Sequence, residues 1–124
     1  MVSILRLHLQ YRLWIAELNA DIDILRIFDD YLGMLEARNN SDNESKSIHN
    51  YKQQFLDLRQ ELDELRHEMH LIKMKLGALA KEQDEVTEDI EKIIEHKSWK
   101  GRYKAFKKKF SEIKKEFKKF EAVD

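Results

Sequence analysis

The stretch that decides the fold is residues 48–79, which read IHNYKQQFLDLRQELDELRHEMHLIKMKLGAL. Apolar side chains recur in it at alternating steps of three and four residues. The ten positions of this repeat, all apolar, are Ile48, Tyr51, Phe55, Leu58, Leu62, Leu65, Met69, Ile72, Leu76 and Leu79. Such spacing puts them on one side of an α-helix and is the seven-residue repeat of coiled coils. The stretch predicts a long amphipathic helix over about residues 45–80.

The N-terminal segment carries the same repeat from Ile4 to Leu35, and nine of its ten positions are apolar. This pattern predicts a helix over about residues 3–38. The exception is Asp21, between Trp14 and Phe28. A buried carboxylate must be paired or protonated. We therefore expect Asp21 to lie at an edge of the core or to pair with a Lys or Arg of another helix.

Further apolar side chains widen the apolar side of this first helix beyond the narrow seam of a two-stranded coiled coil. They exceed what two small neighbouring helices can cover, so we expect them to form an interface with another molecule. The residues of this predicted interface are Ile15, Ile22, Ile24 and Tyr31.

A polar segment at residues 38–43 is the clearest predicted loop, because its side chains compete with the helix for backbone hydrogen bonds. Ser41 and Glu44 after it have the spacing of a capping box, with Ser45 or Ser47 as alternative caps. The second helix therefore begins shortly after this loop.

The third helical segment, over about residues 84–121, changes the phase of its apolar stripe near residues 96–101. His96 is expected to lie at this boundary. A turn at residues 80–86, with Asp84 as N-cap, would give three helices of matched length. The alternative is a second helix that continues to about residue 96 and buries its end against another chain. We favour the turn, because the broad apolar side of the first helix requires two neighbours.

Composition supports a purely helical domain. The 124 residues contain no proline and three glycines, so little interrupts helix propagation. The length is typical of one domain. The sequence predicts a single all-α domain over residues 1–124, an antiparallel three-helix bundle of long helices with coiled-coil-like heptad packing.

Charge is distributed unevenly along the chain. Residues 1–96 contain 12 Lys/Arg and 20 Asp/Glu, a net charge of −8, whereas residues 97–124 contain 11 and 4, a net charge of +7. Lysines cluster near the C-terminus and form a predicted basic surface that could bind nucleic acid phosphates, lie on an anionic membrane or dock on the acidic remainder of the chain. These lysines are Lys107, Lys108, Lys109, Lys114, Lys115, Lys118 and Lys119.

Motifs for catalysis are absent from the sequence. It contains no cysteine and no nucleophilic triad or phosphate-binding loop pattern, and we expect neither enzymatic activity nor a cofactor. A weak metal-site candidate consists of Asp63, His67 and His70, which fall on one helix face. Their position opposite the apolar stripe is equally typical of solvated surface.

Segments of all three predicted helices carry a pattern made up of Trp14, Glu17, Leu18, Phe28, His49, Tyr51, Gln54, Phe55, Glu64, Leu65, Arg66, His67, Glu116, Phe117 and Phe120. Together these segments resemble a group of small bacterial helical proteins of uncharacterised function. This chain departs from the group's pattern in having no proline in the second turn. The resemblance implies a three-helix chain and brings no activity with it.

The function predicted from these patterns is that of a structural or protein-interaction module. Its expected partner is itself, as a homo-oligomer, or another helical protein. The alternative is a nucleic-acid-binding accessory protein that uses the Lys-rich C-terminal helix. The sequence has no unbroken apolar run of transmembrane length, and the expected location is the cytoplasm.

Overall fold

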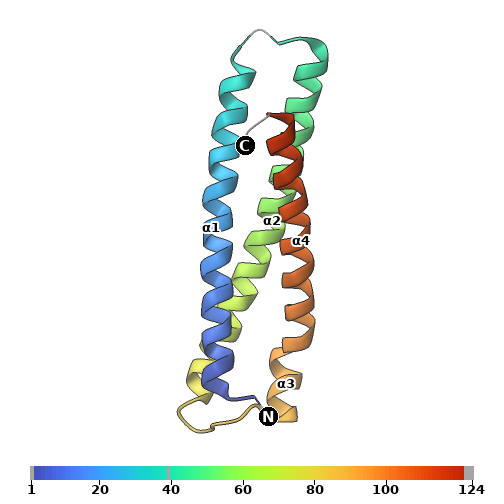
Figure 1. The fold of residues 1–124 in the computed structure, drawn as a ribbon. Coiled ribbons are helices and arrows are strands. Elements are labelled where there is room, and N and C mark those ends of the chain that lie inside the picture. The colour runs from blue at the N-terminus through green and yellow to red at the C-terminus, as the bar shows by residue number, and fades with distance from the viewer. Residues whose placement is uncertain (1, 39, 122–124) are drawn as a thin grey trace.

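The fold is entirely helical in the computed structural model, which describes residues 2–38 and 40–121. The predicted all-α class is confirmed. Over this part of the chain the helices are α1 (Ile4–Glu36), α2 (Asp42–Leu79), α3 (Glu88–Ile94) and α4 (His96–Phe120). In Figure 1, α2 returns antiparallel beside α1, and α4 runs along α2 in the direction of α1. Where one third helix over about residues 84–121 is expected, the structure has the two helices α3 and α4.

Side-chain caps explain where three helices begin. The hydroxyls of Ser3, Ser41 and Thr87 each accept a hydrogen bond from the backbone N–H three residues further on. Each bond satisfies one of the N–H groups that the first turn of a helix leaves unpaired. Ser41 is therefore the cap of α2. The prediction that Asp84 is the N-cap of the third helical segment is wrong, because Thr87 is the N-cap of α3.

The chain leaves the α2 helix at Leu79 and turns before α3, so the alternative of one helix to about residue 96 is wrong. Two backbone hydrogen bonds tie this turn to the start of the chain. Ile4 N–H donates to the Asp84 carbonyl and Val86 N–H to the Val2 carbonyl, both at 2.9 Å. The turn thereby fixes the end of α2 against the start of α1.

Glu95 separates α3 from α4 at the place where the apolar stripe of the sequence changes phase. Its backbone has φ 54° and ψ 44°, in the left-handed region. This conformation costs a residue with a side chain about 1–2 kcal/mol. The break rotates α4 relative to α3, and the apolar side of α4 then faces the core.

The core extends along the three long helices and receives residues from α3 as well. Eight of the ten repeat positions of α2 are buried, and Tyr51 and Leu79 are half-buried. The aromatic residues Tyr103, Phe106, Phe110 and Phe117 of α4 are buried too. No helix in the described part of the chain is both long and apolar enough to cross a membrane.

Candidate functional site

The predicted interface on α1 lies partly inside the chain. Ile22 is only 4% exposed and belongs to the core, so its assignment to a surface interface is wrong. Ile15, Ile24 and Tyr31 are half-buried and pack against the core. The Tyr31 hydroxyl also donates a hydrogen bond to the Glu121 carboxylate. The neighbouring helices therefore cover more of this flank than the sequence suggested.

A different row of apolar side chains lies on the side of α1 that faces away from the core. Its five large members are each 50–67% exposed, and two exposed alanines lie between them. The residues recur at steps of three, four and seven, which places them on one helix face. We call this row the outer face of α1; it consists of Leu5, Leu9, Leu13, Ala16, Ala20, Ile27 and Met34.

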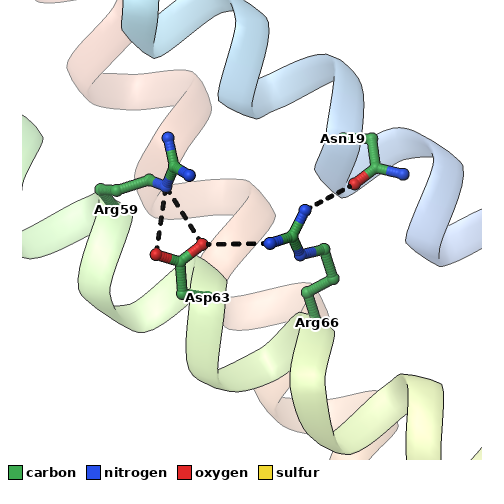
Figure 2. A network of polar contacts seen from close by, with 4 residues as sticks. All are labelled: Asn19, Arg59, Asp63 and Arg66. Atoms are coloured by element: carbon green, nitrogen blue, oxygen red, sulfur yellow. Dashed lines mark hydrogen bonds and ion pairs between the residues drawn. The ribbon is translucent and has the colours of Figure 1, made fainter.

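Asp63, from the metal-site candidate, is instead the centre of a polar network (Figure 2). Arg59 Nε donates to both carboxylate oxygens of Asp63 at 3.0 and 3.1 Å. Arg66 Nη2 lies 3.7 Å from Asp63 Oδ1, and Arg66 Nη1 donates to Asn19 Oδ1 of α1 at 3.1 Å. The network links α2 to α1 across their shared surface groove.

These contacts argue against a metal site at Asp63, His67 and His70. The three side chains border one hollow with Asn19 and Arg66. However, the residues with described positions include no group of three or more His, Cys, Asp or Glu side chains arranged to hold a metal ion. Two guanidinium groups already neutralise the Asp63 carboxylate, so the arrangement disfavours a cation.

Two of the C-terminal lysines hold α4 on the rest of the molecule. Lys107 Nζ lies 2.6 Å from Asp21 Oδ2 of α1, and Lys109 Nζ lies 2.5 Å from Glu61 Oε2 of α2. The expectation that Asp21 pairs with a Lys of another helix is confirmed. Because consecutive residues on a helix point about 100° apart, Lys107 and Lys109 reach different neighbours.

The remaining lysines of the predicted basic surface are more accessible. Lys114 is half-buried, with its ammonium 5.8 Å from the Phe110 ring centroid. Lys108, Lys115, Lys118 and Lys119 are exposed, and no ion pair of theirs is found among the described residues. The α4 aromatic rings are largely buried beneath, so base stacking on them would require α4 to detach.

The joint between α1 and α4 contains a polar cluster that sequence reasoning missed. Tyr11 Oη lies 2.9 Å from His96 Nδ1. The Trp14 ring stacks between His96 and Tyr103, with centroid distances of 5.9 and 4.8 Å. Tyr103 donates its hydroxyl proton to the Glu17 carboxylate. No local pattern in the sequence predicts contacts between residues that lie more than eighty positions apart.

Burial sets the protonation of this cluster. Burial raises the pKa of Tyr11, and the nearby Glu91 carboxylate adds to the shift. Burial lowers the pKa of His96, and although Glu91 acts in the opposite direction, Lys100 reinforces the shift. Both groups are therefore neutral near pH 7, and one hydrogen bond joins the Tyr11 hydroxyl to His96 Nδ1. The cluster is a partly buried, hydrogen-bonded contact between α1 and α4.

Comparisons with protein-family models, with curated proteins and with solved structures find no match for this chain. The resemblance to small bacterial three-helix proteins stays a prediction. Functional inference accordingly depends on the surfaces described above.

Proposed function

We propose that this chain is a structural or protein-interaction module that works by helical association and not by catalysis. The observation that carries the proposal is the outer face of α1. Five large apolar side chains in one row, each at least half exposed, leave apolar area in contact with water. Burying such area yields about 25 cal/mol per Å², and exposed apolar patches mark interaction sites.

In this proposal the three long helices act as an antiparallel three-helix bundle with coiled-coil-like heptad packing, which presents the outer face rigidly. Ion pairs between the helices stabilise such a bundle. Arg102 Nη2 lies 3.2 Å from Glu64 Oε1, and Lys109 contacts Glu61 one turn away on α2. The partner is a second copy of the chain or another helical protein.

Sedimentation velocity over a dilution series of the full chain tests the self-associating form of this proposal. We expect a species heavier than the 15.0 kDa chain that dissociates on dilution. A 15.0 kDa species at every concentration would contradict self-association and restrict the proposal to a different helical partner. The frictional ratio from the same data reports whether the particle is compact or elongated.

A second candidate is a nucleic-acid-binding accessory protein, and the exposed lysines of α4 favour it. Lys115 and Lys119 are one turn apart, where like charges destabilise a helix by a few tenths of a kcal/mol. A phosphate backbone would relieve that repulsion. Titration of random DNA and RNA with the protein tests this candidate: binding at low salt that weakens steeply with ionic strength supports it, and no binding at low salt refutes it.

A further inference from the structure

We infer that the outer face of α1 binds the same face of a second copy of this chain, with the two α1 helices antiparallel. The inference rests on the proposed association and makes it specific. It identifies the partner, the contacting surface and the relative direction of the two helices.

The row is long enough for a helix-to-helix contact. From Leu5 to Met34 it extends over 29 residue steps, about 44 Å at 1.5 Å per residue. Ala16 and Ala20, near its middle, are small, which allows another helix to approach closely, while larger side chains lie toward both ends. Two α1 helices can therefore pack side by side along most of their length.

The exposed area of the chain fits such a pairing. The accessible surface is 8505 Å². A compact monomer of 15.0 kDa has about 7,000 Å². The excess is larger than the roughly 800 Å² that a standard interface removes from each partner. An elongated single chain thus has surface to bury, and the outer face of α1 contains five of the eleven exposed large apolar side chains of the described residues.

Charge selects the antiparallel direction. Exposed arginines, Arg6 and Arg12, flank the row near its N-terminal end, and the exposed Asp30 flanks it farther along. Asp23 and Arg26, between them, pair with each other at 3.5 Å and add no net charge. In a parallel pair Arg6 and Arg12 would lie beside the same arginines of the second copy, whereas in an antiparallel pair they approach its Asp30. Within the described ranges, Arg6, Arg12 and Asp30 form no ion pair, so they can make such contacts between copies.

Other exposed apolar side chains do not compete as a dimer surface. None of these residues continues into a row of comparable length among the described residues; they are Val2 before α1, Leu56, Leu71 and Met74 on α2, Ile93 on α3 and Phe120 at the end of α4. Single exposed apolar residues are ordinary on protein surfaces. Met74, 58% exposed on α2, therefore provides a matched control position.

The first test compares dimerisation of the full chain and its variants by sedimentation. Leu9→Glu combined with Leu13→Glu places four carboxylates in the dimer contact, two from each copy. Because a carboxylate buried against the apolar side chains of the other copy loses its hydration without gaining a partner, we expect the dimer to weaken by at least about 100-fold. Met74→Glu is expected to dimerise as the unsubstituted chain does. Far-ultraviolet circular dichroism confirms that each variant keeps its helices.

Disulfide formation tests the direction of the helices, since the chain has no cysteine of its own. In an antiparallel pair with residue 20 at its centre, the two copies of residue 9 lie about 33 Å apart along the helix axis, beyond disulfide reach. Leu9→Cys alone is expected to stay unlinked. A mixture of Leu9→Cys chains with Ile27→Cys or Met34→Cys chains is expected to yield mixed dimers under mild oxidation.

The outcomes separate this inference from the function it rests on. A dimer that survives the double Glu substitution overturns the outer-face interface but leaves self-association standing. Efficient self-linking of Leu9→Cys overturns the antiparallel direction alone. A chain that stays monomeric at all concentrations overturns both the dimer and the self-associating form of the proposed function.

Discussion

Substitution of Lys107 by Met should destabilise the chain far more than an ordinary surface substitution. The Asp21 side chain is 7% exposed, that of Lys107 is 30% exposed, and their charged atoms lie 2.6 Å apart. Removing one partner of a fully buried pair costs about 3–5 kcal/mol, because the other charge stays buried alone. Water reaches the lysine end of this pair, so we expect a loss of about 2–3 kcal/mol. For a chain of this length that lowers the melting temperature by about 10 °C.

Urea unfolding followed by circular dichroism at pH 7 measures this loss. Lys108→Met is the matched control, since Lys108 is exposed and should change the unfolding free energy by less than about 0.5 kcal/mol. The double variant Asp21→Leu with Lys107→Met should regain most of the loss, because a leucine between Trp14 and Phe28 completes the apolar stripe. The reasoning is refuted if Lys107→Met is no worse than Lys108→Met, or if the double variant stays as unstable as the single one.

Further predictions concern the helix boundaries and the half-buried His96. Burial lowers the pKa of His96 in the folded state, whereas in the unfolded state this pKa has its ordinary value of 6.5. At a pH below 6.5 the unfolded state therefore binds more protons than the folded state. The stability that is present above pH 6.5 is therefore lost as the pH falls toward the folded-state pKa. Between pH 7.5 and pH 5 the melting temperature of His96→Gln should fall less than that of the unsubstituted chain, as measured by thermal unfolding. Glu95→Gly should raise the unfolding free energy by about 1 kcal/mol by relieving the left-handed backbone, whereas Lys92→Gly inside α3 should lower it by about as much. Ser41→Ala should lower the unfolding free energy by about 1 kcal/mol, because it removes the side-chain cap of α2. Ser45→Ala removes no cap bond and should lower it markedly less when both variants are unfolded in urea.

The regular part of the fold could be predicted because it depends on local periodicity. In α2 the seven-residue repeat identifies the buried side directly, since side chains three and four positions apart share a helix face. The loop before α2 and its cap at Ser41 follow from polar residues whose hydrogen-bonding preferences are local. The split at Glu95 is visible in the sequence only as a phase change. Whether the helix overwinds or breaks there depends on the packing of α4.

The surface could be predicted less well, because a helix sequence does not reveal which flank its neighbours occupy. Ile15 and Ile22 occupy equivalent positions of the repeat in α1, each directly after a core position. Ile22 is 4% exposed and belongs to the core, whereas Ile15 is only half-buried. Likewise, the contact between Tyr11 and His96 depends on α4 returning alongside α1. Only tertiary structure brings such residues together.

The same helical geometry reduces the number of lysines that the C-terminal helix offers to an external anion. In the run from Lys107 to Lys109, successive side chains point about 100° apart, so the first reaches Asp21 on α1, the third reaches Glu61 on α2 and Lys108 between them faces solvent. Two of three consecutive lysines thus neutralise charges of the chain itself and position α4 between its neighbours. An external polyanion would therefore meet fewer cations than the sequence suggests. Loss of Lys108 should weaken any phosphate binding without unfolding, whereas loss of Lys107 should destabilise the helical assembly first.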